Sequence, residues 1–352
     1  MATTILNTPN TDNPILTSDL YSLSAQTSSI SVKVSVIRDP DGDIDEFFET
    51  NLYAHNGIVT FSDIGSLIEG RLREVNRISD IFEIKIGDAS FEFVALYCEY
   101  QLDSLFSSEG YLRSFFSSSY TRLVTRNSRI HLAYWNNGQI AFVFRFVGKD
   151  FSGKIISAET PFQLEAGFDS FDLPVSTILT FAPASLAEIS YFAISFGEAQ
   201  KMFFLTDDIP CISFEYKNMF NATDYIDIFG SITTKTAVSR EEAVCSGNTQ
   251  QYNRILSRSY EVQTGPLTDD QVREFEQLVA SHQVLLPSHG HKFPILITDH
   301  TVEVSDNDEA LPSVKFTFRF ASNRINITLA NMGALARVAP GIFTKEFTDQ
   351  FS

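Results

Sequence analysis

The sequence predicts a mainly β protein made of two or three β-sandwich-like domains, with single amphipathic helices near 62–76 and 268–282. Three observations support this fold class. The 352 residues include 32 Phe and 12 Tyr, and aromatic side chains favour the pleated, half-buried surface of a strand. Short apolar stretches alternate with polar residues at a period of two. Turn residues separate these stretches at short intervals.

Composition and pattern divide the chain into five segments. Residues 1–30 are rich in Ser, Thr and Asn and are predicted to be a flexible N-terminal arm. We expect a β domain with one helix over 31–105, a β-sandwich-like middle domain over 106–205, and a C-terminal β domain with one helix over 206–332. Residues 333–352 are predicted to be an extended C-terminal arm.

The elements of the first β domain follow from polarity. Alternation from Val32 to Val36 predicts a strand, and a second apolar stretch runs from Phe47 to Tyr53. Apolar residues recur at helical spacing from Ile64 to Val75, which predicts an amphipathic helix. Two alternating runs on either side of Gly87-Asp88 predict a hairpin.

In the middle domain the clearest signal is Asn136-Asn-Gly138, which separates two apolar runs, 131–135 and 140–146. Asn-Gly between such runs predicts a hairpin. Further strands are expected near 162–164, 177–181 and 189–196.

The third domain opens with alternation over 212–216, and a run of polar turns and strands then leads to 260–264. Thr268 and Gln271 form the pattern of a capping box, which predicts the start of a helix. Strands are expected around 295–297 and over 314–320.

The formal net charge of −18 at pH 7 disfavours two classes of partner. A nucleic-acid-binding protein needs Lys and Arg to replace the counterions of the phosphates, so we expect no direct sequence-specific contact with nucleic acid. No apolar stretch approaches the ~20 residues that span a bilayer, so we expect no membrane insertion. Cys98, Cys211 and Cys245 are scattered along the chain, and we expect free thiols.

His289 and His291 are the only candidates for a metal site. They lie among four histidines between His282 and His300, and an extended segment places residues i and i+2 on the same side. No nearby Cys or Glu completes a ligand set, so we expect no metal and no cofactor.

No catalytic motif stands out. An acidic turn beginning at Asp39 resembles a calcium loop, but Ile44 and Thr50 stand where that loop needs Gly and Glu. Asp207 and Asp208 are neighbouring carboxylates, with nothing in the sequence to mark them as an acid/base pair. We therefore expect no enzymatic activity and name no catalytic residue.

A resemblance to a known group of proteins rests on scaffold residues. These are Phe214–Phe220, Lys235-Thr236, Val238–Arg240, Ala243–Gly247, Tyr252, Tyr260–Leu267, Leu296–Asp299, Val304–Asp308 and Lys315–Phe320. In these segments the region 212–321 resembles tail-associated virion proteins of tailed bacteriophages and prophages. The end Ala339–Phe347 resembles a short segment near the start of contractile tail-sheath subunits, but no sheath domain follows it.

The resemblance implies a structural component of a phage tail or baseplate. Such a protein would assemble as a homo-oligomeric ring and dock neighbouring tail proteins, and it would lie in the virion tail after synthesis in the cytoplasm of the host bacterium. One alternative is a receptor- or carbohydrate-binding β-sandwich at a tail tip or cell surface, marked by a concave aromatic cluster open to solvent. A second alternative is a tail-tip hydrolase, which would need converging carboxylates or a His–metal site in a cleft.

The C-terminal arm supplies the predicted interaction residues Ile342, Phe343 and Phe347. They follow the break at Pro340-Gly341 and are too apolar to be left in water without a partner. We expect them to contact a neighbouring subunit or another tail protein.

Overall fold

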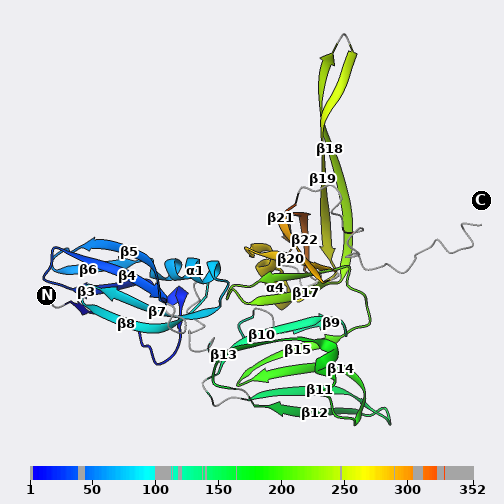
Figure 1. The fold of residues 1–352 in the computed structure, drawn as a ribbon. Coiled ribbons are helices and arrows are strands. Elements are labelled where there is room, and N and C mark those ends of the chain that lie inside the picture. The colour runs from blue at the N-terminus through cyan, green and yellow to red at the C-terminus, as the bar shows by residue number, and fades with distance from the viewer. Residues whose placement is uncertain are drawn as a thin grey trace, which may run out of the picture.

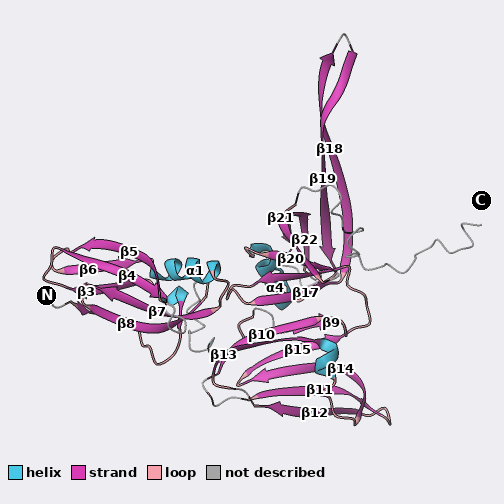
Figure 2. Cartoon of the chain, in the orientation of Figure 1, coloured by secondary structure: helices cyan, strands magenta, loops and turns pink. Residues whose placement is uncertain are grey.

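The structure is a computed structural model. It describes residues 3–38, 44–99, 112, 114–117, 121–136, 138, 141–163, 165–245, 248–288, 290–303, 312–322 and 329. These residues form three β units, and a long hairpin projects from the third (Figure 1). Strands dominate, as Figure 2 shows, and amphipathic helices lie at α1 (Ile64–Glu74) and α4 (Asp269–Ala280). The predicted fold class and both predicted helices are confirmed.

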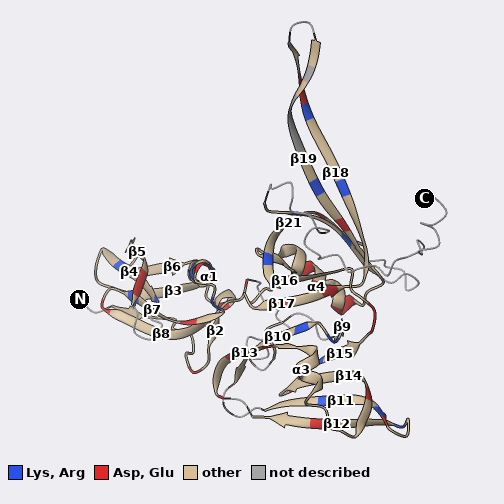
Figure 3. Cartoon of the chain, turned by 45° about the vertical axis from the view of Figure 1, so that its right-hand side comes forward, with Lys and Arg blue, Asp and Glu red and all other residues tan. Residues whose placement is uncertain are grey.

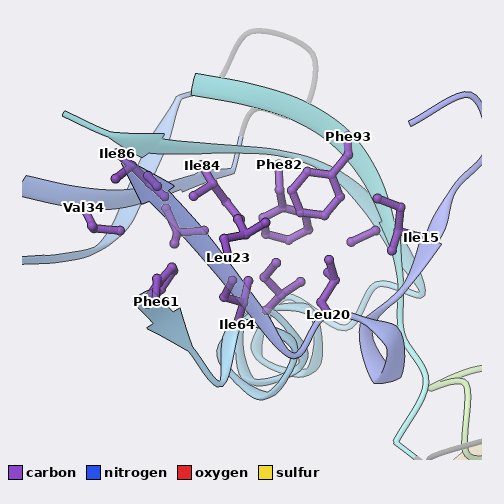
Figure 4. Packing of buried hydrophobic residues seen from close by; sticks show 14 of the residues in the cluster. Ile15, Leu20, Leu23, Val34, Phe61, Ile64, Phe82, Ile84, Ile86 and Phe93 are labelled. Carbon is purple, nitrogen blue, oxygen red and sulfur yellow. The ribbon is translucent and has the colours of Figure 1, made fainter. Parts of the chain in front are cut away.

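The first unit packs two sheets and α1 around one core. Its strands are β1 (Thr4–Ile5), β2 (Ile15–Leu16), β3 (Ser22–Gln26), β4 (Ser31–Arg38), β5 (Asp45–Tyr53), β6 (Ile58–Ser62), β7 (Ser79–Ile86) and β8 (Ala89–Leu96), with a short 3-10 helix, η1, at Thr17–Asp19. The sheet orders are β1-β3-β6 and β2-β8-β7-β4-β5. In Figure 4, Ile64 of α1 and Phe61 of β6 face Phe82 and Ile84 of β7 across this core. The predicted hairpin at Gly87-Asp88 is the β7–β8 pair, in register at Ile86↔Ala89.

Residues 3–30 belong to this unit, so the predicted flexible N-terminal arm is wrong for them. Strand β3 lies between β1 and β6 in the smaller sheet. Leu16, Leu20, Leu23 and Ala25 are all buried. These few apolar side chains anchor an otherwise polar segment to the core. Each of the three buried leucines contributes about 1.5–3 kcal/mol.

The middle unit is a sandwich of a five-stranded and a two-stranded sheet. Its elements are β9 (Thr121–Val124), β10 (Arg129–Asn136), β11 (Phe142–Asp150), β12 (Ile155–Phe162), β13 (Gly167–Pro174), α3 (Val175–Leu179), β14 (Leu186–Phe196) and β15 (Ala199–Leu205). The sheet orders are β12-β11-β14-β15-β9 and β10-β13. Phe142 lies between the two sheets, with its ring centroid 4.7 Å from Tyr134 and 5.4 Å from Phe196.

The hairpin predicted around Asn136 is wrong, because β10 and β11 lie in different sheets. Strand β10 pairs with β13, and β11 pairs with β12 and β14. The Asn136 side chain is buried; it accepts a hydrogen bond from the Gly138 amide at 3.1 Å and donates one to the Glu165 carbonyl at 3.0 Å. These bonds link the end of β10 to the loop before β13, the strand that is its true partner.

The strand predicted near 177–181 is also wrong. This segment begins with the helix α3, in which Val175 and Ile178 are buried. Their spacing of three places both side chains on one helical face. Over so few residues an apolar pattern of this kind does not separate a helical turn from a strand.

The third unit is one seven-stranded sheet covered by α4. Its strands are β16 (Ile212–Lys217), β17 (Thr223–Ile228), β18 (Gly230–Cys245), β19 (Asn248–Thr264), β20 (Val284–Ser288), β21 (His291–Glu303) and β22 (Ser313–Phe320), in the order β17-β16-β20-β21-β22-β19-β18. The capping box of α4 is confirmed, since the side chains of Thr268 and Gln271 bond each other's backbone N–H groups.

The turn between β16 and β17 joins the units. Asn218 donates a hydrogen bond to the carbonyl of Phe116 at 2.9 Å, and Asn221 donates one to the carbonyl of Arg77 at 2.9 Å. A hydrophobic cluster around this turn draws side chains from all three units. Its buried members are Leu16, Leu96, Cys98, Leu112, Phe116, Ala133, Phe220 and Ala222. Among the described residues, this cluster is where the three units meet in one core.

Candidate interaction surfaces

The most prominent feature of the surface is the hairpin of β18 and β19. The two strands pair from Gly230↔Thr264 to Cys245↔Asn248. Strand β22 pairs with β19 only over Tyr260–Gln263. Beyond that point the two strands pair only with each other in the described part of the chain. At about 3.3 Å per residue, the ten or so outer residues of β18 extend roughly 30 Å from the body (Figure 1).

The base of the hairpin is built for close contact between its strands. A Cβ atom at Gly230 would lie 2.1 Å from the carbonyl oxygen of Gln263, so any larger residue would push the strands apart. Lys235 and Lys315 both form ion pairs with Glu261, at 2.5 Å and 3.0 Å. The two ion pairs link β18, β19 and β22 at the base of the ribbon.

The outer hairpin is exposed on both faces. Val238 is 47% exposed and Val244 is 75% exposed. An isolated two-stranded hairpin is at best marginally stable in water, and a long unpaired edge is a template for pairing with another chain. We therefore take the outer hairpin, Lys235–Ser259, as the main candidate interaction surface.

The charge of the hairpin differs from that of the whole chain. Residues 231–259 contain four Lys or Arg and two Asp or Glu, whereas the whole chain contains 26 Lys or Arg and 44 Asp or Glu. Figure 3 shows basic residues spaced along both strands. Arg240 is exposed and lies at a register shift between Ser239 and Glu241, where a bulge bends the ribbon and redirects its side chains.

A second candidate surface is a cleft of about 550 Å³ between the middle and third units. One wall is the β9–β10 turn, and another is the segment Thr206–Pro210 that joins β15 to β16. Asp207 and Asp208 are exposed on this segment, and Ile209 beside them is 66% exposed. The cleft therefore has two exposed carboxylates and an exposed apolar residue on this wall, and the exposed Arg126 on the wall formed by the β9–β10 turn.

Asp227 also lines the cleft, but its carboxylate is already used. One oxygen accepts a hydrogen bond from the hydroxyl of Ser128 and the other accepts one from the hydroxyl of Ser213. The bond from Ser128 ties the β9–β10 turn to the third unit, and the bond from Ser213 joins β16 to β17. A carboxylate held in this way is a structural link, so Asp207 and Asp208 are the carboxylates of the cleft available to a ligand.

A buried charge cluster lies deeper in the same junction. Arg122 of β9 contacts Asp224 of β17 at 2.7 Å and Glu274 of α4 at 2.5 Å. Lys201 of β15 donates a hydrogen bond to the hydroxyl of Ser117, which donates to Asp224 at 3.1 Å. All five residues are buried, and together they join the middle unit to the third.

The environment of this cluster shifts its pKa values in opposite directions. Burial alone would lower the pKa of Arg122, but the Asp224 and Glu274 carboxylates raise it above its ordinary value. Burial and the Arg122 guanidinium lower the pKa of Lys201 to about 7. Burial opposes ionisation of Asp224, but Arg122 and Lys201 hold its pKa below the ordinary value.

We predict that Lys201 makes the stability of the protein depend on pH. Between about pH 7 and the ordinary lysine value of 10.5, the unfolded state binds a proton that the folded state does not, so stability rises with pH in this window. Below about pH 7 the lysine is charged in both states, and its burial penalty is fully present. At 1.36 kcal/mol per pKa unit, the rise is roughly 3–5 kcal/mol.

The measurement is urea unfolding of the wild type and the Lys201→Met variant at several pH values. The wild type is expected to gain stability relative to the variant as the pH rises from 7 to 10, because methionine binds no proton. Parallel pH profiles for the two proteins would contradict the assignment.

The residues predicted from the sequence to form sites are not brought together. His291 begins β21 exposed, and His300 lies within the same strand opposite Phe316. His289, and the predicted interaction residues Ile342, Phe343 and Phe347, lie outside the described residues. Within the residues that are described, no group of three or more His, Cys, Asp or Glu is placed to hold a metal ion. Of the predicted free thiols, Cys98 is buried and Cys211 is half-buried, and neither forms a disulfide.

The lining of the cleft can be compared with what each alternative function requires. A carbohydrate-binding surface was expected to show a concave aromatic cluster, and no described residue that lines the cleft is aromatic. Of the three carboxylates that line the cleft, Asp227 is held by two serine hydroxyls, and Asp207 and Asp208 are exposed. No helix in the described part of the chain is long and apolar enough to cross a membrane.

Comparison with known proteins gives partial structural similarity only. No protein-family model and no curated protein matches the chain. A chain in the tail of an empty gene transfer agent particle, refined with C6 helical symmetry, matches 32% of this chain and 91% of its own length, at 12% identity and a TM-score of 0.23. A chain in the virion of a native gene transfer agent particle matches 28% and 85%, at 12% identity and a TM-score of 0.21. The calcium-binding domain CBD12 of CALX1.1 matches 55% and 79%, at 10% identity and a TM-score of 0.16. Similarity at these TM-scores assigns no family to the chain.

Proposed function

We propose that this chain is a non-catalytic structural component of a phage-tail or baseplate assembly, in which copies associate as a homo-oligomeric ring. The observation that carries the proposal is the outer hairpin. It projects about 30 Å at strand spacing and exposes both faces and both edges of a two-stranded ribbon. Such a ribbon gains stability only when another surface covers it.

The resemblance of residues 212–321 to tail-associated virion proteins is the reason for proposing a phage tail as the assembly. That region includes the hairpin, the strands that support it and α4. The three β units meet in one core at the turn between β16 and β17, which suits a subunit that must bear load between neighbours. The C-terminal residues Ile342, Phe343 and Phe347 are proposed as a second contact, onto a neighbouring subunit or another tail protein.

Trimming the hairpin tests the proposal. Replacing residues 237–257 with Asn-Gly keeps the Thr236↔Arg258 pair and closes it with a two-residue turn suited to a hairpin. We expect the trimmed chain to stay folded, because the removed part pairs with no strand of the body among the described residues. Light scattering should give multiples of 39.5 kDa for the wild type and a single copy for the trimmed variant.

A matched control is Phe151→Ala, which removes an exposed aromatic side chain from the turn between β11 and β12 and leaves the hairpin intact. It should assemble as the wild type does. A trimmed variant that forms the same oligomer as the wild type would contradict the proposal.

A further inference from the structure

The hairpin and the cleft are complementary surfaces carried by the same chain. The hairpin has an excess of basic residues and ends near an exposed apolar residue, Val244. One wall of the cleft has two exposed carboxylates, Asp207 and Asp208, next to an exposed apolar residue, Ile209, and the exposed Arg126 lies on another wall. A cleft of about 550 Å³ is within the size range of sites that enclose a ligand.

A chain cannot fill its own cleft with its own hairpin. The hairpin leaves the third unit pointing away from the middle unit (Figure 1). The cleft lies at the junction of the third unit with the middle unit, where Asn127 and Ser128 of the middle unit and Leu286 and Pro287 of β20 all line it. A contact between the two surfaces must therefore join different copies.

We propose that the outer hairpin of one copy seats in the cleft of a second copy against its acidic wall, with Arg240 facing Asp207 and Asp208 and with Val244 covered near Ile209. This inference rests on the proposed function, because it names the surface that receives the hairpin in the assembly. Each copy offers one hairpin and one cleft, so the contact is head-to-tail. A head-to-tail contact closes into a ring when its rotation divides a full turn evenly.

The contact has a defined electrostatic character. Exposed opposite charges steer association and set the register of an interface, and salt screens them. Assembly should therefore weaken as salt rises from 50 mM to 500 mM. A register shift lies beside Arg240, and a shift of this kind increases the local twist of a ribbon, which affects how the ribbon meets the cleft.

A charge swap in the full-length chain tests the pairing. Arg240→Glu alone and Asp207→Arg with Asp208→Arg are each expected to raise the concentration for half-assembly about tenfold or more, since like charges then meet across the interface. The triple variant restores opposite charges, and its half-assembly concentration should return to within about threefold of the wild-type value. Asp207→Asn with Asp208→Asn removes the attraction without adding repulsion. It should raise the half-assembly concentration by less than the double arginine variant does.

Glu276→Arg is the matched control. It makes the carboxylate-to-arginine change once, at an exposed position of α4 that does not line the cleft, and it should assemble as the wild type does. The melting temperature of each variant, followed by circular dichroism, verifies that the chain is folded.

The outcomes separate this inference from the proposed function. If trimming the hairpin abolishes assembly but the cleft variants assemble as the wild type does, the hairpin binds another surface or another protein, and the inference is overturned while the proposed function stands. The inference is also overturned if the half-assembly concentration of the triple variant is as high as that of the variants changed on one surface only. If the trimmed chain assembles normally, both fail.

Discussion

Replacing Arg122 with methionine is expected to destabilise the folded protein by roughly 3–5 kcal/mol. The variant leaves Asp224 and Glu274 buried without the guanidinium that contacts both at 2.5–2.7 Å. Removing one partner of a buried ion pair costs this much because an uncompensated charge stays in a medium of low polarity. Urea unfolding followed by fluorescence measures the loss, since Trp135 is the only tryptophan and packs against the core in which the three units meet.

Arg145→Met is the matched control for Arg122→Met. Arg145 pairs with Glu159 at 2.6 Å, and both side chains are about half exposed. Exposed ion pairs contribute about 1 kcal/mol or less, so the control should lose no more than that. Equal losses in the two variants would mean that the buried cluster is as well solvated as a surface pair.

Truncating Phe142 to alanine is expected to cost about 3–5 kcal/mol, the range measured for large aromatic side chains in cores. Phe142 is 2% exposed. Its ring contacts Tyr134 on the opposite sheet, and Phe115, Phe171 and Phe196 lie 5.4–5.5 Å away between ring centroids. The cavity would therefore open between the two sheets of the middle unit.

Phe151→Ala is the comparison for Phe142→Ala, because the same atoms are removed from a side chain that is 83% exposed. Its free energy of unfolding should stay within about 0.5 kcal/mol of wild type. A Phe142 variant as stable as the Phe151 variant would show that the sheets repack around the missing ring.

The sequence predicts those parts of the fold that local chemistry decides. The helix at α4 follows from the capping box of Thr268 and Gln271 and from an apolar face at helical spacing. The β7–β8 hairpin follows from two alternating runs around Gly87, which has φ +66° and so favours glycine. In both cases the deciding contacts join residues near one another in the chain.

Strand partners in the middle unit could not be predicted in this way. Strands β10 and β11 are apolar at most positions because the core of the sandwich lies between them. Their turn is compatible with a hairpin, and only tertiary packing decides that β10 pairs with β13 instead. Residues 3–30 show the same limit, since their composition is polar and their few apolar side chains anchor them to a core built by later strands.

The sequence predicts the interaction surfaces only in part. The sequence shows Asp207 and Asp208 as neighbouring carboxylates, but the cleft they line needs β20 and the β9–β10 turn to form. The sequence predicts only polar turns and strands where the long hairpin lies, because its two exposed faces leave no alternation of polar and apolar residues. The signal that was available is the run from Gly230 to Cys245, rich in Thr and Val and without Pro, which favours strand.

Negative-stain imaging of the purified full-length chain tests the central claim most directly. At concentrations where light scattering detects an oligomer, we predict closed rings with one hairpin per copy engaged on its neighbour and no rings for the variant with residues 237–257 replaced by Asn-Gly. Single particles at every concentration, or rings that persist without the hairpin, would contradict the account.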